Sequence, residues 1–395
     1  MSEGKPLVGV RVLDMTRVVS GPLCGRLLAD LGAEVVKLEP PDGDTTRAVP
    51  PYVGGVSPYY AQMNAGKRNV CVDLKAPGAP EAVARMAAKC DVFLENFRPG
   101  VLARFGLDAD SLLAANPALV YCSITGWGQD GPWADRRSYA PLVHADVGTM
   151  ELAARRRGRR PEQEINQHAD VHSATLATSA VLAALLQRVA TGTGQRLDMA
   201  LGQSAFYANE WAAVELQPPA DEFGRFDTWN HFTYRLGDGS YVALIGDPVE
   251  LFPAWAKSLG APEEVLADER FASAGARRAH VEELVAAIDE LTSAFPDFAA
   301  LDAVLDPWML AAPVRSVADL AASEWASRRR LVAEAEPGLP VPAAPWASSG
   351  ADVSTGGGVA GLGADNRAVL VELGFTDREV DALVDAGALR MGAQP

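Results

Sequence analysis

Asp170 is the side chain whose surroundings most suggest chemistry. It stands in the segment QHADVHSATL, just before an apolar run that predicts a buried helix over roughly 170–190. An aspartate there usually caps the helix, because its carboxylate accepts hydrogen bonds from the first backbone N–H groups. The same N–H groups and the helix dipole would keep a carboxylate ionised, as a carboxylate nucleophile requires, and would stabilise a developing oxyanion. The local sequence is compatible with both roles.

Polar and charged residues gather on loops that follow predicted strands. The loops TRVVSGP (16–22), LKAPG (74–78), ENFRPG (95–100) and TGWGQDGP (125–132) each come after a short apolar run. In open α/β sheets ligands bind at the carboxyl ends of the strands, so we expect ligand contacts on these loops. A single Lys75 or Arg98 is ordinarily a solvated charge, but several basic residues on adjacent loops favour an anionic ligand.

These loops belong to a predicted α/β domain. The first 125 residues alternate short apolar runs with helical patterns, which predicts a parallel sheet covered by helices on both faces, in a large domain over 1–210. Residues 211–335 contain a predicted hairpin with an Asp238-Gly239 turn and several amphipathic helices, and indicate a smaller α+β domain. Residues 336–395 are expected to form a linker and helices that return to the large domain. The charged segment 150–164 is expected to be an exposed loop.

The composition excludes several classes of protein. The formal charge of −16 disfavours nucleic acid and anionic membrane surfaces as partners, although basic clusters leave an anionic ligand open. No run approaches about 18 apolar residues, so we expect no membrane span. The start has no apolar signal-peptide core, and the spacing of the four cysteines suits neither zinc nor a disulfide framework. The sequence therefore predicts a cytoplasmic enzyme without a metal.

Several segments, in a fixed order, resemble class III CoA-transferases, the group that includes formyl-CoA transferase, the carnitine CoA-transferases and α-methylacyl-CoA racemase. They are VRVLDMTRVVSGPLCGRLLADLGAEVVKLEPPDGDTTR, NAGKRNVCVDLK, ENFRPGVLARFGL, SITGWGQDGP, LAALLQRVATGTGQRLDMAL and GLGADNRAVLVELGFTDREVDAL. The resemblance covers most of the chain and is weakest between 205 and 330. It implies a large Rossmann-like CoA-binding domain, a small domain, and a homodimer of interlocked rings.

The resemblance also implies a reaction in which CoA moves from an acyl-CoA to a carboxylic acid. The family's nucleophilic aspartate falls on Asp170, which would form a mixed anhydride with the acyl group and then a thioester with CoA. CoA and acyl-CoA are thus substrates, and no cofactor is bound permanently. The residues expected to contact CoA are Val18, Leu74, Lys75, Asn96, Phe97, Arg98, Arg104 and Arg137, those expected to wall the acyl site are Val19 and Tyr59, and Tyr139 is expected to act beside Asp170.

Four positions depart from the family's pattern. Pro40 stands where the family often has a basic residue, Val19 replaces the glutamine of formyl-CoA transferase, and Ala169 replaces the usual glycine before the nucleophile. Tyr139 stands where the racemase branch has a histidine, and a phenol is a poor base at neutral pH. CoA transfer is therefore preferred over racemisation.

Other functions stay open at this point. An α-methylacyl-CoA racemase-type enzyme would need His144 or His168 as a substitute base, and a non-catalytic CoA-binding homologue would keep the fold alone. A nicotinamide oxidoreductase is disfavoured because the first strand–helix turn lacks GxGxxG. The residues that favour a bulky or apolar acyl group are Trp211, Trp229, His231, Phe232 and Tyr234.

Overall fold

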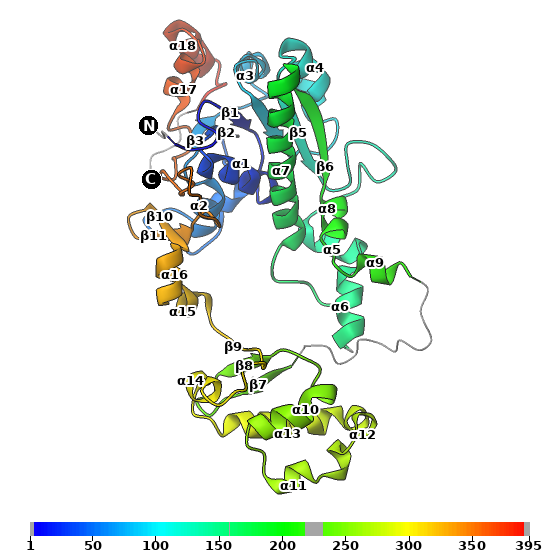
Figure 1. The fold of residues 1–395 in the computed structure, drawn as a ribbon. Coiled ribbons are helices and arrows are strands. Elements are labelled where there is room, and N and C mark those ends of the chain that lie inside the picture. The colour runs from blue at the N-terminus through cyan, green and yellow to red at the C-terminus, as the bar shows by residue number, and fades with distance from the viewer. Residues whose placement is uncertain (1–3, 158, 218–231, 391–395) are drawn as a thin grey trace. The chain divides into compact units, whose positions relative to one another are not determined.

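A parallel six-stranded sheet organises the larger part of the chain (Figure 1). The structure is a computed structural model that describes residues 4–157, 159–217 and 232–390. The strands are β1 (Arg11–Asp14), β2 (Glu34–Glu39), β3 (Arg68–Cys71), β4 (Val92–Glu95), β5 (Val120–Thr125) and β6 (Gln195–Ala200). They follow the order β3-β2-β1-β4-β5-β6, and every neighbouring pair is parallel. The prediction of a mixed α/β fold with a parallel central sheet is confirmed. The order reverses between β1 and β4, where a crevice for ligands is expected.

Helices cover both faces of this sheet because strand side chains alternate between two apolar cores. On β1, Val12 belongs to one core and Leu13 to the other, as the two-residue period of a strand requires. The first core includes α1 (Ser20–Asp30), α5 (Ala140–Asp146), α7 (His168–Thr191) and α8 (Leu201–Tyr207). The second includes α3 (Ala79–Ala87), η2 (Leu102–Phe105), α4 (Ala109–Ala115), α17 (Asn366–Glu372) and α18 (Asp377–Asp385). The C-terminal helices thus pack on the sheet face opposite α1 and α7.

The long helix α7 begins at His168, two residues before Asp170. Gln167 precedes the helix, so Asp170 lies inside the first turn and is not the N-cap that its sequence suggested. By length and composition alone α7 could cross a membrane, although the apolar runs of the sequence predicted no such helix. In this structure Ala174, Ala177 and Val181 of α7 are buried in the first core.

Shorter elements complete the unit that contains the sheet. This unit comprises Met1–Glu151, Glu162–Leu216 and Glu324–Pro395. Its remaining elements are η1 (Thr45–Ala48), α2 (Pro58–Asn64), α9 (Ala212–Glu215), α16 (Glu324–Arg329), β10 (Val332–Glu336) and β11 (Leu339–Pro342). The helix α6 (Thr149–Arg157) occupies the first part of the segment 150–164, so the expected loop is wrong there, whereas residues 159–164 form neither helix nor strand. Its sequence TMELAARRR is rich in good helix formers, and the density of charge concealed that propensity.

The second unit has an apolar core of its own. This unit comprises Leu152–Pro161 and Gln217–Ser323. Its antiparallel sheet consists of β7 (Thr233–Arg235), β8 (Tyr241–Leu244) and β9 (Ala311–Pro313), and β7 and β8 form the hairpin predicted at Asp238-Gly239. Its helices are α10 (Pro248–Ser258), α11 (Glu263–Leu266), η3 (Glu269–Phe271), α12 (Ala274–Ala279), α13 (Val281–Ser293), α14 (Phe298–Asp302) and α15 (Val317–Ala321).

The aromatic residues that suggested a bulky acyl group are placed only in part. Tyr234 is 1% exposed and packs edge-on against Trp255, and Phe232 packs on the same core of the second unit. These two rings stabilise that unit. Trp229 and His231 lie outside the described residues.

Candidate active site

Asp170 lies in the first turn of α7, against the first turn of α1. Its carboxylate forms a hydrogen bond with Ser20, the first residue of α1. Burial raises the pKa of Asp170 to about 6, and the Ser20 hydrogen bond opposes this rise. Loss of solvent therefore outweighs the helix end in setting this pKa. A group with this pKa is still roughly nine-tenths ionised at pH 7.

A pocket of about 210 Å³ opens beside Asp170 at the carboxyl ends of β1, β4 and β5. Other residues expected in the site also line it, namely Val18, Val19, Asn96, Phe97, Arg98 and Tyr139. The sequence did not predict Arg17, Ser20 or Arg136, which line the same pocket. The position between β1 and β4 matches the reversal of strand order, where an α/β sheet leaves room for a ligand.

Two tyrosines flank Asp170 in different ways. Tyr139 is 67% exposed and stands directly before α5, with its side chain at the pocket. Tyr59 is outside the pocket lining, but burial and then the charge of Asp170 raise the pKa of its phenol, so it lies near that carboxylate. The wall beside Tyr139 depends on Gly126, because a Cβ there would fall 2.1 Å from Oγ of Ser138.

The loop after β1 holds a strained residue at the pocket. Val18 has a φ of 69°, a left-handed conformation that β-branched residues rarely adopt. The Asp44 carboxylate accepts the Val18 N–H at 3.1 Å. The Asn96 side chain accepts the Arg17 N–H and donates to the Arg17 carbonyl, both at 2.8 Å. Such strain persists only where the surroundings over-determine the backbone, and here two side chains from other loops do so.

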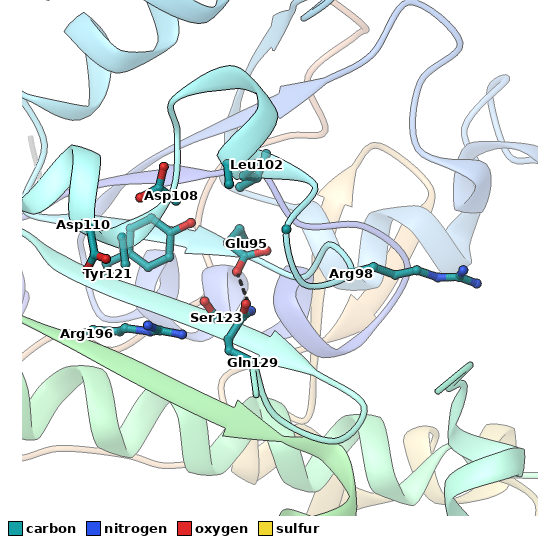
Figure 2. Close-up of a pocket in the computed structure, with 12 residues that line it drawn as sticks. Glu95, Arg98, Leu102, Asp108, Asp110, Tyr121, Ser123, Gln129 and Arg196 are labelled. Carbon is teal, nitrogen blue, oxygen red and sulfur yellow. Dashed lines mark hydrogen bonds between the residues drawn. The ribbon is translucent and has the colours of Figure 1, made fainter. Parts of the chain in front are cut away.

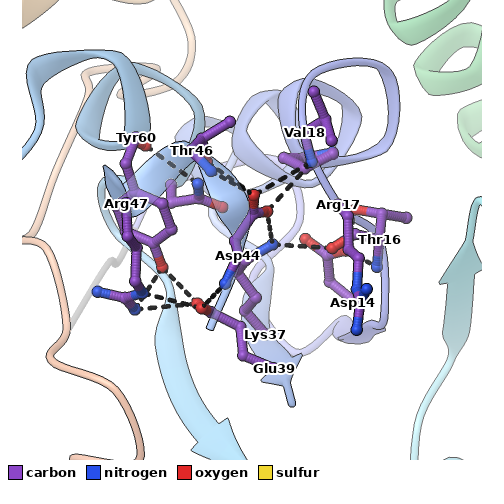
Figure 3. A network of polar contacts seen from close by, with 12 residues as sticks. Asp14, Thr16, Arg17, Val18, Lys37, Glu39, Asp44, Thr46, Arg47 and Tyr60 are labelled. Carbon is purple, nitrogen blue, oxygen red and sulfur yellow. Dashed lines mark hydrogen bonds and ion pairs between the residues drawn. The ribbon is translucent and has the colours of Figure 1, made fainter. Parts of the chain in front are cut away.

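A buried network of charges fixes Asp44 and the loop (Figure 3). Lys37, 1% exposed, pairs with Asp44 at 3.2 Å and donates to the Thr16 carbonyl at 2.9 Å. Asp44 also accepts the Thr46 N–H at 3.0 Å. Lys67 pairs with buried Asp14 at 2.8 Å. Buried charges are tolerated when paired and hydrogen-bonded in this way, so the loop has a rigid support.

Glu39 extends this network to Arg47 and Tyr60 (Figure 3). Arg47 donates two hydrogen bonds to its carboxylate, at 2.8 and 2.9 Å, and the Tyr60 hydroxyl donates a third at 2.6 Å. Burial alone would raise the pKa of Glu39, but Arg47 and Lys37 lower it to about 2. The Arg47 guanidinium also stacks 3.9 Å from the centroid of the Tyr60 ring. Glu39 therefore stays ionised and accepts the Asp44 N–H at 2.7 Å.

A second and larger pocket adjoins the first. It has a volume of about 610 Å³ and shares Arg17 and Phe97 with the pocket beside Asp170. Leu74 and Lys75, which the sequence predicted to contact CoA, line this second pocket. The two pockets therefore meet at Arg17 and Phe97, with Asp170 in one and Lys75 in the other.

A second basic side chain lines this pocket, and it comes from the C-terminal end of the described residues. Pro40 lines the pocket in place of the basic residue common in the family. Arg390 lines it as well, 3.9 Å from Asp73. Arg390 can thus supply the positive charge that Pro40 cannot. No feature of the sequence signalled this, because the two residues are far apart along the chain.

Two predicted basic residues line neither pocket. Arg104 and Arg137 are both exposed, and neither belongs to either lining. The neighbouring Arg136 lines the Asp170 pocket; it pairs with Asp146 at 2.8 Å and stacks 4.7 Å from the Trp133 ring centroid. Arg17 and Ser20 could have been found, since both stand in the TRVVSGP loop that follows β1.

Glu95 supports the ENFRPG loop from within the sheet (Figure 2). Its carboxylate accepts the Phe97 N–H at 2.8 Å and the Gln129 amide at 3.2 Å. Burial raises the pKa of Glu95 to about 7, against the hydrogen bonds from Ser123 and Phe97. Figure 2 shows the Arg98 side chain extending away from this carboxylate. Glu95 thus holds the backbone of the loop whose side chains line the site.

Comparisons with known proteins show the family of the chain. The sequence model of CoA-transferase family III matches residues 7–366. The chain is 36% identical over 354 residues to the succinate–glutarate CoA-transferase of Agrobacterium fabrum, covering 85% of this chain and 87% of that protein. It is 32% identical over 354 residues to the acetyl-CoA:oxalate CoA-transferase of Acetobacter aceti, covering 88% of this chain and 90% of that one.

A solved structure is similar to this chain over nearly its whole length. The crystal structure of a CAIB/BAIF family protein from Brucella suis has a TM-score of 0.82 at 32% identity, covering 94% of this chain and 100% of that one. The chain therefore belongs to CoA-transferase family III. The predictions of a class III CoA-transferase and of CoA transfer from an acyl-CoA to a carboxylic acid are confirmed.

Proposed function

We propose that the protein transfers CoA through covalent intermediates on Asp170. A carboxylate oxygen of Asp170 attacks the thioester carbonyl carbon of the donor, the C–S bond breaks, and CoA leaves as the thiolate. The thiolate then attacks the Asp170 carbonyl carbon of the mixed anhydride, so that an aspartyl-CoA thioester forms and the donor acid leaves as its carboxylate. The acceptor carboxylate repeats the two steps in reverse, and Asp170 returns to its ionised form.

The placement of Asp170 carries this proposal. The carboxylate is half-buried at the pocket, and its pKa of about 6 makes it more basic than an ordinary aspartate while it remains mostly ionised at pH 7. The first N–H groups of α1 have no acceptor within that helix, and Val19 supplies no side-chain cap. They are therefore suited to stabilise the oxyanion that forms during each attack.

The two pockets suit the two ends of an acyl-CoA. The larger pocket contains Lys75 and Arg390, which suit the phosphates of the nucleotide end. The smaller pocket contains Asp170, which must meet the thioester. Arg17 and Phe97 line both pockets, so they would contact the pantetheine chain between them. Arg104 and Arg137 remain predicted CoA contacts that the proposal does not need.

The lining of the smaller pocket favours a dicarboxylic acid as donor acyl group or acceptor. Among the described residues that line it, Arg17, Arg98 and Arg136 stand with one carboxylate, Asp170. A second carboxylate on the substrate would pair with an arginine, and the guanidinium fork suits that geometry. The two relatives described above are named for succinate, glutarate and oxalate. A bulky apolar acyl group has less support, because Tyr234, one of the aromatic residues that suggested it, is buried in the core of the second unit.

Racemisation has less support than CoA transfer. A racemase needs a second base beside the α-carbon, and Tyr139 offers only a phenol. His144 is 3% exposed and does not line the pocket. The interlocked homodimer and the cytoplasmic location follow from the resemblance and the composition, and they stay predictions.

Chemical trapping tests the proposal. The protein is incubated with succinyl-CoA and hydroxylamine, digested, and analysed by mass spectrometry. We expect a hydroxamate on Asp170 in the wild type and none in D170N, which should also lose CoA exchange into glutarate. Turnover with Asp170 unmodified would refute the covalent route. Exchange of the α-proton in deuterated water without an acceptor acid would instead indicate a racemase.

Substrate class is tested separately, by comparing acceptors. Arg98→Met should lower kcat/KM for glutarate by about tenfold and for butyrate much less, because only glutarate has a second carboxylate to lose a partner, at roughly 1.4 kcal/mol per tenfold. Arg378→Met, which changes an exposed arginine of α18 outside both pockets, is the matched control. Equal losses for both acids would refute the dicarboxylate preference.

A further inference from the structure

His144 is buried next to the backbone of the proposed nucleophile. It belongs to α5, is 3% exposed, and its Nε2 accepts the Ala169 N–H at 2.9 Å. Ala169 is fully buried and directly precedes Asp170. The other ring nitrogen, Nδ1, is enclosed and has no hydrogen-bond partner among the described residues. The structure thus places one histidine against the turn that carries the reacting carboxylate.

This contact completes the start of α7 from outside that helix. The first N–H groups of a helix need acceptors, and a side chain just before the helix usually supplies one. Gln167, which precedes α7, makes no such side-chain hydrogen bond. The acceptor for Ala169 therefore comes from α5, 25 residues earlier in the chain. α5 also begins directly after Tyr139, so one short helix joins two parts of the site.

The contact requires a neutral imidazole. A ring nitrogen that accepts a hydrogen bond carries no proton, so the proton of neutral His144 must be on Nδ1. Protonation of Nε2 would place two donors face to face and break the bond to Ala169. Burial, and then the charge of His168, lower the pKa of His144, and His172 acts in the same direction while Glu164 opposes them. The helix α8 also packs on α5, and its titratable residue is Tyr207, which is 81% exposed.

We propose that His144 is a positioning residue for Asp170, which acts by accepting the Ala169 N–H and so holding the first turn of α7 against Ser20. The inference rests on the proposed role of Asp170 and adds to it a second group that must be deprotonated. Asp170 must be ionised to attack, and His144 must be neutral to hold it. As the pH is lowered, kcat should therefore fall for two separate reasons, protonation of Asp170 and protonation of His144.

The test compares two substitutions of His144. In H144Q the amide oxygen can accept the Ala169 N–H, whereas in H144L a side chain of similar bulk cannot. We expect H144L to lower kcat for CoA exchange between succinyl-CoA and glutarate by about tenfold or more, with KM for succinyl-CoA changed less than about twofold. H144Q should recover at least about a third of the wild-type kcat. His172→Leu, a nearby histidine without this bond, should keep kcat within about twofold of wild type.

The pH profile separates positioning from a merely structural role. The acid limb of log kcat should approach a slope of two in the wild type and a slope of one in H144Q, because only Asp170 then titrates. Nitrogen-15 NMR of the histidines should find His144 protonated at Nδ1 and unprotonated at Nε2 at neutral pH. Equal slopes in both proteins, or the same kcat for H144L and H144Q, would overturn the proposal.

Failure of this inference can be told from failure of the covalent mechanism. If hydroxylamine traps Asp170 at the same rate in H144L and wild type, the role of His144 is refuted while the nucleophile stands. If the wild type gives no hydroxamate, the mechanism itself is refuted. Should H144L fail to fold, H144Q and the NMR measurement on the wild type still decide the question.

Discussion

Replacing Val18 with glycine tests whether the loop beside Asp170 stores strain. The φ of 69° at Val18 costs a β-branched residue about 1–3 kcal/mol, and glycine adopts this φ freely. Two effects of glycine oppose this gain. The greater entropy of the unfolded chain lowers the free energy of unfolding by about 1 kcal/mol, and the loss of the partly buried Val18 side chain lowers it by about 1 kcal/mol more. We expect V18G to change the free energy of unfolding by no more than about 1 kcal/mol in either direction.

The next residue provides a matched control. Val19 has an unstrained φ of −124° and is 3% exposed. V19G relieves no strain, carries the same entropy penalty, and loses a fully buried side chain with the cavity it leaves. It should destabilise the protein by about 3 kcal/mol. Two adjacent Val→Gly changes should therefore differ by about 2 kcal/mol or more.

The assay must report on the unit that contains the sheet, because two units need not unfold together. Native-state hydrogen exchange, read by mass spectrometry on peptides of β1 and α1, gives that local stability for both variants and the wild type. V18G should also lower kcat/KM, since the loop is no longer preset beside Asp170. If V18G is as destabilising as V19G, the loop at Val18 is not strained.

Three further predictions concern charge. Burial raises the pKa of Glu95 to about 7 in the folded protein, whereas a glutamate of the unfolded chain titrates near pH 4.5. The protonated Glu95 carboxyl therefore contributes stability that is fully present below pH 4.5 and is lost as the pH rises to 7. Hydrogen exchange on peptides of β4, measured at pH 5 and pH 8, should therefore find E95Q more stable than wild type at pH 8 by on the order of 2 kcal/mol, with little difference at pH 5. Lys67→Met leaves Asp14 buried without its partner and should cost about 3–5 kcal/mol, seen as a lower Tm; an unchanged Tm would contradict the network. The kcat/KM of wild type should fall with acid below about pH 6 as Asp170 is protonated, and a profile flat to pH 4.5 would contradict a raised pKa at Asp170.

The sheet could be predicted because its signals are local and repeated. Runs such as RVLD and VVKLE have the apolar character of strands buried on both faces, and the helix-forming segment between them ends near Gly32. The Asp238-Gly239 turn identified its hairpin because few residues tolerate the φ values that such a turn needs. In these places local preference and tertiary structure agree.

The site was predicted less completely because its supports are distant in sequence. Asn96 was expected to contact CoA, and it lines the pocket, but its side chain also clamps the backbone of Arg17. Asp44, which holds Val18, had no motif that linked it to the site. Rules for motifs identify residues that face a ligand more easily than residues that hold those residues in place.

The start of α7 illustrates why local rules failed at the central residue. Capping preferences describe acceptors within a few residues of the helix, and they assigned that role to Asp170. The acceptor for Ala169 is instead His144 from another helix, so the helix begins earlier and Asp170 is free of the capping role. A carboxylate released from capping can line a pocket, as Asp170 does, and the proposed reaction requires this.

The pKa of Asp170 follows from a comparison of magnitudes. A helix end stabilises a carboxylate by about 0.3–1 kcal/mol, which is less than one pKa unit, whereas burial can shift a pKa by up to about 3–5 units. Burial therefore decides the sign, and the pKa rises to about 6. A less stable carboxylate is a better nucleophile towards a thioester, provided that it remains ionised at the working pH. The value near 6 meets both conditions at pH 7, so the partial burial that a capping rule overlooks is what suits this aspartate to the proposed covalent role.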